Sequence, residues 1–212
     1  MYKVAILFDS KNNWISKFLP KDLFDIENYD IKIFFDPTLI EAYDLVFVLG
    51  YTKILSENFL NINHLVLVVH ESNLPKGKGF SPVQWQILEG KNNIKVCLIE
   101  ATKDFDSGDI LEEEEIIFNG TELYEEIRFI QAKVTFNLLL KFLKKYPRFE
   151  RKPQTGEATF YSKRRPKDSE LDVNLSLKRL FPFMRIANND DWPSFFKLNG
   201  ETYILKIYKK DK

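Results

Sequence analysis

Short runs of continuous apolar residues, separated by polar stretches, are the dominant pattern in the first part of the chain. They lie at residues 2–8, 31–35, 45–50 and 65–69. Their short length and β-branched content are typical of buried strands. The segments between them are polar and partly helical. Such strands, alternating with helices, predict an α/β fold with a mostly parallel sheet that is covered on both faces.

The predicted elements continue with a helix over residues 81–90 and then a pair of strands. The strands are expected at 94–101 and 109–117. The sequence Asp-Ser-Gly-Asp at 106–109 lies between them, and these residue types favour tight turns. We therefore expect the two strands to pair as a hairpin around this turn.

A long amphipathic helix is predicted over residues 121–145. Thr121 is the expected N-cap, and the glutamates of the first turn suit the positive end of the helix dipole. Pro147 follows a lysine-rich last turn and predicts the end of the helix. Apolar residues recur at spacings of three and four along one face, namely Leu123, Ile127, Ile130, Val134 and Leu138.

The composition changes after this helix. Residues 148–168 are basic and polar, and we expect them to form a connector. The pattern predicts a main domain over residues 1–150 and a small C-terminal extension over 151–212. Within the extension we expect a helix and two strands joined by an Asn-Gly turn, at 174–187, 194–198 and 202–208.

The overall composition excludes several classes of protein. Hydrophobic residues make up 44% of the chain and aromatic residues 15%, which excludes a disordered chain. The 31 basic and 31 acidic side chains leave no basic excess, so no nucleic-acid partner is expected. No apolar run approaches the roughly 18 residues of a membrane span, so no membrane partner is expected either.

The cysteine content and the start of the chain predict a location. Cys97 is the single cysteine, which excludes an internal disulfide and a cysteine-rich metal site. No His, Cys and Asp residues have the spacing of metal ligands, so no metal is expected. The first residues read as a strand and are too short for a signal peptide. We therefore expect a cytoplasmic protein.

The stretch from residue 64 to residue 82 carries the strongest candidate chemistry. Its apolar strand delivers His70 to a carboxyl end, where ligands bind in open α/β sheets. The following loop contains Gly77 and Gly79, which permit close approach of a ligand to the backbone. Asp106, in the turn after the next strand, is the natural partner to set the tautomer and basicity of His70.

Structural roles for these residues stay open at this point. A lone histidine at a strand end is as often a structural hydrogen-bonding group as a catalyst, and Asp106 is also typical of an Asx-turn. The glycine loop lacks the spacing of a nucleotide-binding fingerprint. Lys76 and Lys78 suit a phosphate, although most loop lysines are simply solvated. His64, at the opposite end of the strand, is expected to be structural.

Several segments together resemble the folate-dependent formyltransferase family. That family has the pattern Asn-x-His-x-Ser-Leu-Leu-Pro, then a glycine-containing loop and a proline, and then Asp-x-Gly. The match here is His70-Glu71-Ser72-Asn73-Leu74-Pro75, Gly79, Pro82 and Asp106-Ser107-Gly108. The chain is most similar to the sugar N-formyltransferases, especially those of pseudaminic acid biosynthesis.

The C-terminal part carries the same resemblance, and one position departs from it. Residues 164–172 resemble the Arg-Arg-x-Pro-Glu-Asp-x-x-Ile-Asp segment of sugar formyltransferases, and 185–187 and 192–193 resemble its later Arg-Ala and Trp-Pro elements. The family's catalytic Asn, which helps to hold the developing oxyanion, is replaced by Val68. The alternative donors are a backbone N–H, Ser72, Asn73 or a protonated His70.

The resemblance implies a Rossmann-like catalytic domain that transfers the formyl group of N10-formyltetrahydrofolate to the primary amine of a nucleotide-linked deoxyamino sugar. His70 would stabilise the tetrahedral intermediate and move protons, and Asp106 would orient it. The folate is expected against Tyr51, Thr52, Lys53, Lys103, Asp104 and Phe105. The acceptor is expected against Glu71, which positions the amine, and against Ser72, Lys76, Lys78, Gly79, Phe80, Ser81, Pro82, Arg164 and Arg165.

The resemblance also favours a UDP-linked sugar of a pseudaminic acid-type surface glycan pathway. The C-terminal hairpin suits either the edge of a homodimer or a lid. A methionyl-tRNA acceptor is disfavoured by the short segment after residue 150 and by the absence of a basic excess. A folate-dependent hydrolase that releases formate stays open, as does a non-catalytic module that binds folate or nucleotide sugar, which Val68 favours.

Overall fold

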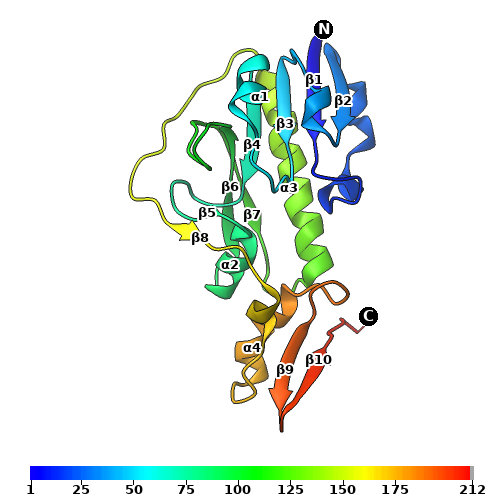
Figure 1. The fold of residues 1–212 in the computed structure, drawn as a ribbon, viewed down its shortest axis with the longest axis vertical. Coiled ribbons are helices and arrows are strands. Elements are labelled where there is room, and N and C mark those ends of the chain that lie inside the picture. The colour runs from blue at the N-terminus through cyan, green and yellow to red at the C-terminus, as the bar shows by residue number, and fades with distance from the viewer. Residues whose placement is uncertain (211–212) are drawn as a thin grey trace.

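A six-stranded sheet forms the centre of the computed structural model, which describes residues 1–210 (Figure 1). The strand order is β2-β1-β3-β4-β6-β7. The first four strands are parallel, whereas β6 runs antiparallel to β4 and β7 antiparallel to β6. The predicted α/β fold with a mostly parallel sheet is confirmed. The strands are β1 Tyr2–Leu7, β2 Tyr29–Phe34, β3 Leu45–Val48, β4 Val66–His70, β6 Asn93–Glu100 and β7 Ile110–Ile117.

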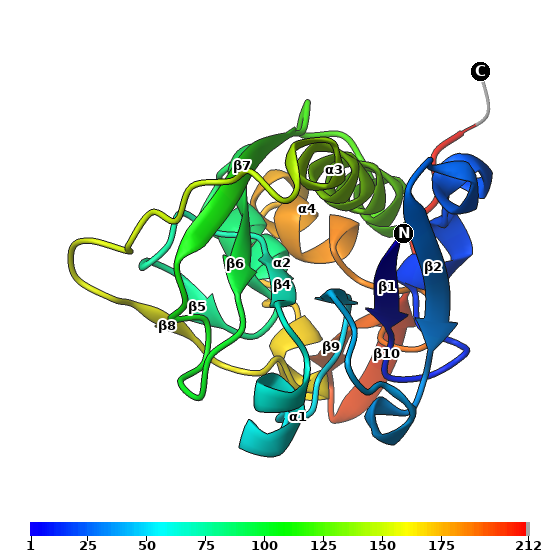
Figure 2. The same cartoon turned by 90° about the horizontal axis from the view of Figure 1, so that it is seen from above.

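Helices cover both faces of this sheet. α3 (Tyr124–Lys145) lies on one face and α1 (Glu57–Ile62) on the other (Figure 2). Successive side chains of a strand point to opposite faces, so the strands supply two apolar clusters. In β1, Val4 and Ile6 pack in the larger cluster with α3, and the intervening Ala5 packs in the cluster with α1. Burial on both faces explains the continuous apolar runs of the parallel strands.

Shorter helices complete these layers. α2 (Pro82–Leu88) contributes Val83 and Ile87 to the larger cluster. Among residues 1–210, no helix combines the length and apolar content that a transmembrane span requires. Short 3-10 helices lie at Ile15–Phe18, Lys21–Asp25, Pro37–Leu39 and Pro166–Ser169.

The long helix begins later than its sequence pattern predicts. Thr121 is not the N-cap, because α3 starts at Tyr124 and Leu123 occupies the cap position. The Leu123 N–H donates to Glu126 Oε2 at 2.8 Å, which satisfies one of the free donors of the first turn. The Thr121 hydroxyl instead donates to Asn119 Oδ1, within a turn that precedes the helix.

The C-terminal segment lies below the carboxyl ends of the parallel strands (Figure 1). α4 (Leu177–Arg185) packs there with the hairpin of β9 (Ser194–Leu198) and β10 (Glu201–Leu205). Asn199 and Gly200 both have positive φ, as a tight two-residue hairpin turn requires. These elements share a small apolar core of their own, centred on Leu171, Leu180 and Met184.

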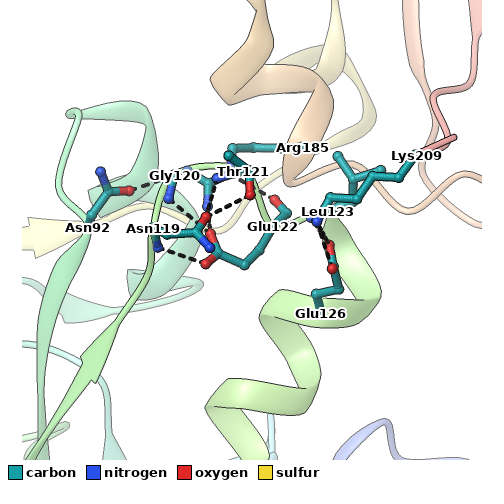
Figure 3. A network of polar contacts seen from close by, with 9 residues as sticks. All are labelled: Asn92, Asn119, Gly120, Thr121, Glu122, Leu123, Glu126, Arg185 and Lys209. Carbon is teal, nitrogen blue, oxygen red and sulfur yellow. Dashed lines mark hydrogen bonds and ion pairs between the residues drawn. The ribbon is translucent and has the colours of Figure 1, made fainter. Parts of the chain in front are cut away.

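A buried ion pair joins this segment to the start of α3 (Figure 3). Arg185 Nη2 lies 2.7 Å from Glu122 Oε2, and the two side chains are 5% and 8% exposed. The Arg185 guanidinium also donates to the Glu122 carbonyl at 2.9 Å and to Asn92 Oδ1 at 3.3 Å. Burial lowers the pKa of Arg185, while the nearby Glu122 and Glu126 carboxylates oppose that shift. Two of these contacts fix α4 to the loop before α3, and the third fixes it to the segment before β6.

The stretch predicted as a plain connector takes part in the fold. It runs from the end of α3 back along the β6–β7 side of the sheet (Figure 1). Lys152 forms an antiparallel bridge with Ile110. Further along, β8 (Phe160–Tyr161) pairs in parallel with β5 (Lys78–Gly79), which lies in the glycine loop after His70. Besides leading from α3 to the C-terminal segment, residues 148–168 therefore also pair with Ile110 and with the glycine loop.

Candidate active site

A cavity of about 920 Å³ lies at the carboxyl ends of β1, β3 and β4. Asp9, Gly50 and Glu71, which follow these three strands, all line it. The loop after β6, one side of α3 and the segment that contains β8 complete its wall. The carboxyl edge of an open α/β sheet is where ligands bind, so the cavity is the candidate active site.

His70 and Asp106 meet in the wall of this cavity. His70 Nδ1 lies 3.4 Å from Asp106 Oδ1, and the side chains are 6% and 12% exposed. His70 Nε2 lies 2.8 Å from the carbonyl oxygen of Gly77. A carbonyl can only accept, so Nε2 carries a proton and Nδ1 is the nitrogen that faces the carboxylate. The pair is therefore arranged for proton exchange at Nδ1.

Asp106 reaches His70 because the loop after β6 folds back on itself. β6 is antiparallel to β4, and Ala101 donates its N–H to the carbonyl of Val66 at the amino end of β4. Asp106 then adopts a left-handed conformation with φ of 49°. A Cβ on Gly108 would lie 1.8 Å from the carbonyl oxygen of Glu100. Close backbone approach thus explains the glycine of the Asp-Ser-Gly turn.

The glycine loop holds the pair from the other side. Gly77 accepts from His70, and the N–H of Gly79 donates to Asp106 Oδ2 at 2.8 Å. Between them, the buried Lys78 donates from Nζ to Ser107 Oγ at 2.7 Å. Gly77, Lys78 and Gly79 therefore hold three neighbouring groups in place, namely the His70 ring, the Ser107 hydroxyl and the Asp106 carboxylate.

Replacing Gly79 by alanine tests this arrangement. The new Cβ would lie 2.4 Å from the backbone oxygen of Tyr161, so β5 would have to shift. We expect this shift to break the hydrogen bond from the N–H of residue 79 to Asp106 Oδ2. We expect kcat to fall about ten-fold or more, since a hydrogen bond to a charged group is worth roughly 1.5–3 kcal/mol.

Gly156→Ala is the matched control for this substitution. Gly156 shares the positive φ, but a Cβ there meets nothing within 4 Å. Steady-state kinetics and urea denaturation of the two variants separate the clash from backbone strain. Equal losses in both variants would show that the contact between β5 and Asp106 is not needed.

The residues expected to bind folate line one side of the cavity, namely Tyr51, Thr52, Lys53, Lys103, Asp104 and Phe105. Val68, Leu55 and Leu60 form an apolar floor next to them. Burial raises the pKa of the Tyr51 hydroxyl, and the Asp36 and Asp9 carboxylates add to that shift. Apolar surface framed by irregular loops suits a flat heterocyclic ring.

The residues expected to bind the acceptor fall into two groups. Ser72, Lys76 and Lys78 are not part of the cavity wall. Ser72 is buried and its carbonyl oxygen accepts from Cys97 Sγ, Lys76 is exposed, and Lys78 is turned toward Ser107. The others line the cavity, namely Glu71, Gly79, Phe80, Ser81, Pro82, Arg164 and Arg165.

α3 supplies a polar wall that the sequence reasoning missed. The Arg128 guanidinium lies 4.3 Å from the centroid of the Trp14 ring and donates to Gln131 Oε1 at 2.9 Å. Because arginine only donates, Gln131 turns its NH₂ group outward, and that group donates to Glu71 Oε1. Thr135 continues this wall. Polar residues at spacings of three and four within an apolar helix were the available signal.

The structure narrows the donors that could replace the missing Asn amide. Val68 itself lines the cavity, two residues before His70. Ser72 and Asn73 do not line it, whereas His70 does. Of the four alternative donors to the oxyanion, His70 and the backbone N–H groups therefore remain. Among residues 1–210, no three His, Cys, Asp or Glu side chains cluster so that they could hold a metal ion.

Comparison with known sequences agrees with these motifs. A family model described as formyl transferase matches residues 16–136, a range that includes His70 and Asp106. The methionyl-tRNA formyltransferase of Francisella philomiragia is 30% identical over 173 residues, which cover 78% of this chain and 55% of that protein. The chain spans about half the length of the curated relatives it matches.

Solved structures share the fold over almost the whole chain. A methionyl-tRNA formyltransferase from Clostridium thermocellum has a TM-score of 0.81 at 20% identity and covers 100% of this chain and 94% of its own. A sugar N-formyltransferase from Shewanella sp. has a TM-score of 0.73 at 14% identity, with 100% and 99% covered. HypX from Aquifex aeolicus, solved with tetrahydrofolic acid, has a TM-score of 0.73 at 16% identity, with 97% and 37% covered. The family model matches more than half of the residues, and the chain belongs to the formyl transferase family.

Proposed function

We propose that the protein transfers the formyl group of N10-formyltetrahydrofolate to the primary amine of a nucleotide-linked deoxyamino sugar, in the cytoplasm and for a pseudaminic acid-type surface glycan. Membership of the family and the His70–Asp106 pair support formyl transfer. The cavity of about 920 Å³ is large enough for a donor and part of an acceptor together. Residues 1–150 would carry the donor site and the pair, and residues 151–212 would complete the acceptor site.

Arg164 gives the main support for a phosphate-bearing acceptor. Its half-buried guanidinium lines the cavity, lies 5.7 Å from the centroid of the Trp85 ring and donates to the Asp168 carbonyl. Burial lowers the pKa of Arg164, and the Asp168 carboxylate partly opposes this shift. Among residues 1–210, no carboxylate oxygen lies within 4 Å of its nitrogens. A desolvated guanidinium of this kind suits a diphosphate, which it can bind in bidentate fashion.

The donor would bind between the loop after β3 and the loop before Asp106. Backbone groups of Tyr51 to Lys53 and of Lys103 to Phe105 would bind the polar edge of the ring, and Val68 and Leu55 would contact its face. When bound, the donor would supply an electrophilic formyl carbon for attack by the amine. These residues suit the ring of the folate, because they combine an apolar surface with backbone groups of irregular loops.

The residues of the chain would then act on the amine and on the developing charge. Glu71, held by Gln131, would accept a hydrogen bond from the acceptor amine. As the amine nitrogen bonds to the formyl carbon, His70, protonated at Nδ1, would stabilise the developing oxyanion, and Asp106 would stabilise the imidazolium. The bond between the formyl carbon and N10 would then break. The amine would lose one proton to Glu71 or His70 and N10 would leave with one proton, so the products would be the formamide and tetrahydrofolate. Gly77 keeps the ring oriented through Nε2. Val68 contributes no polar group to this step.

The acceptor is tested by mass spectrometry with N10-formyltetrahydrofolate and a panel of UDP-, GDP- and dTDP-linked amino sugars. We expect one added formyl group on one nucleotide-linked sugar, with a UDP-linked sugar favoured. The matching free amino sugar should react about ten-fold more slowly or worse, because a charge-assisted contact to Arg164 is worth roughly 1.5–3 kcal/mol. Formate release without any amine would indicate a hydrolase, and binding without transfer would indicate a binding module.

Methionyl-tRNA is the second candidate acceptor and belongs in the same panel. It is favoured by the names of the curated relatives, which match at 30% identity. The equal numbers of basic and acidic residues, 31 of each, speak against a partner with as many phosphates as a tRNA. Formylation of methionyl-tRNA with no reaction of any sugar would contradict the sugar assignment.

A further inference from the structure

We propose that residues 152–161 form a positioning strap for the His70–Asp106 pair, with Gln154 and Thr159 as its two positioning residues. This strap belongs to the polar stretch after α3 and crosses the β6–β7 side of the sheet (Figure 1). Its two ends contact the two halves of the pair. The kinetic part of the proposal depends on the proposed function, whereas the structural part does not.

The first end of the strap holds the turn that carries Asp106. Gln154 Nε2 donates to the carbonyl oxygens of Asp106 and Gly108, both at 2.9 Å. Lys152 and Ile110 exchange two backbone hydrogen bonds beside it, both at 2.9 Å. Asp106 has a left-handed conformation, which is less costly for Asp than for most residues but still benefits from groups that hold it in place. Gln154 supplies that restraint on both sides of Ser107.

The second end holds the peptide that orients His70. Thr159 Oγ1 accepts from the N–H of Gly77 at 2.8 Å, and the Thr159 carbonyl accepts from the N–H of Lys78 at 2.9 Å. The carbonyl of Gly77 is the partner of His70 Nε2 at 2.8 Å. The peptides of Gly77 therefore lie between the imidazole on one side and Thr159 on the other. One side-chain hydroxyl of the strap thus acts on the ring through a single residue.

Neither positioning residue is part of the cavity wall, so both act through the groups they hold. The Gln154 side chain spends both donors on the Asp106 turn, while its own Oε1 is buried without a partner among the described residues. An unsatisfied buried acceptor weakens a fold. The Gln154 amide is therefore better explained by its effect on the position of Asp106 than by a contribution to the stability of the fold.

The test is a ¹⁵N NMR spectrum of the histidine rings, because the chain contains two histidines, His64 and His70. His64 is exposed and serves as an internal control. Thr159→Val keeps the shape but removes the hydroxyl, and Gln154→Leu removes the amide. We expect both changes to shift the His70 ring nitrogens and to leave His64 unchanged. Thr159→Ser should retain the wild-type spectrum, as should Glu157→Gln, which alters an exposed residue of the same strap.

Kinetics provide the second readout. Thr159→Val and Gln154→Leu should lower kcat about ten-fold or more with KM values for donor and acceptor unchanged, because misplacement of catalytic groups affects the chemical step. Unaltered His70 signals in both variants, or equal behaviour of Thr159→Val and Thr159→Ser, would overturn the proposal. If Thr159→Val loses the fold, the comparison of Gln154→Leu with wild type decides. Shifted His70 signals in a protein that transfers no formyl group would support the strap and overturn the proposed function.

Discussion

Replacing His70 by alanine is expected to lower kcat for formyl transfer by about 10²-fold or more, on the usual scale of acid–base and oxyanion contributions. The imidazole lies between Gly77 and Asp106 and lines the cavity, so its removal leaves Asp106 without its partner at Nδ1. Asp106→Asn should have a similar effect, since it removes the charge that stabilises a protonated His70. Single-turnover measurements with saturating donor and acceptor report this loss directly.

His64→Ala is the control for this result, because the exposed His64 precedes β4 and lies outside the cavity. It should leave kcat unchanged. Donor binding, followed by fluorescence titration, should survive in the His70 and Asp106 variants. Near-normal turnover by either of these variants would remove the pair from the mechanism.

Replacing Arg185 by methionine is expected to destabilise the fold by about 3–5 kcal/mol, the usual cost of leaving one partner of a buried ion pair uncompensated. Among residues 1–210, Glu122 would keep only the backbone N–H groups of Asn119 and Gly120 as partners. α4 would also lose its polar link to the loop before α3 (Figure 3). Urea denaturation followed by circular dichroism measures the change in free energy of unfolding.

Lys209→Met gives the matched control, because Lys209 and Glu126 form an ion pair in the same network that is 45% and 48% exposed (Figure 3). Exposed pairs contribute below about 1 kcal/mol, so this variant should differ little from wild type. The double variant Glu122→Gln/Arg185→Met should recover part of the loss, since no buried charge is left. A similar small effect for Lys209→Met and Arg185→Met would contradict a structural role for the buried pair.

The apolar pattern was sufficient to predict the elements that bury a continuous or periodic face. β4 and α3 are such elements, and each lies within a few residues of its predicted range. The predicted start of α3 was wrong because the Thr121 hydroxyl donates to Asn119 Oδ1 instead of capping the helix. The spacing of apolar residues gives no information on such local side-chain hydrogen bonds. The sequence did not predict that β6 runs antiparallel to β4, because apolar runs carry no information on strand direction.

The candidate site shows the same division. The motif indicated His70 and Asp106, and in the structure His70 Nδ1 lies 3.4 Å from Asp106 Oδ1. The roles of Gln154 and Thr159 depend on backbone carbonyls and N–H groups as partners. Such bonds leave no trace in residue type or spacing. Gln131 was missed because its role comes from contact with Glu71, sixty residues earlier in the chain, and Arg128 was missed because it acts through Gln131.

In the proposed reaction, the His70–Asp106 pair promotes transfer of a formyl group from folate to an amine. The most direct test follows ¹³C-labelled formyl carbon from N10-formyltetrahydrofolate by NMR in the presence of a nucleotide-linked amino sugar. We expect the label to appear as a formamide on the sugar with wild-type protein and to stay on the folate with His70→Ala. Label released as free formate, or label that stays on folate with wild-type protein and every acceptor, would contradict it.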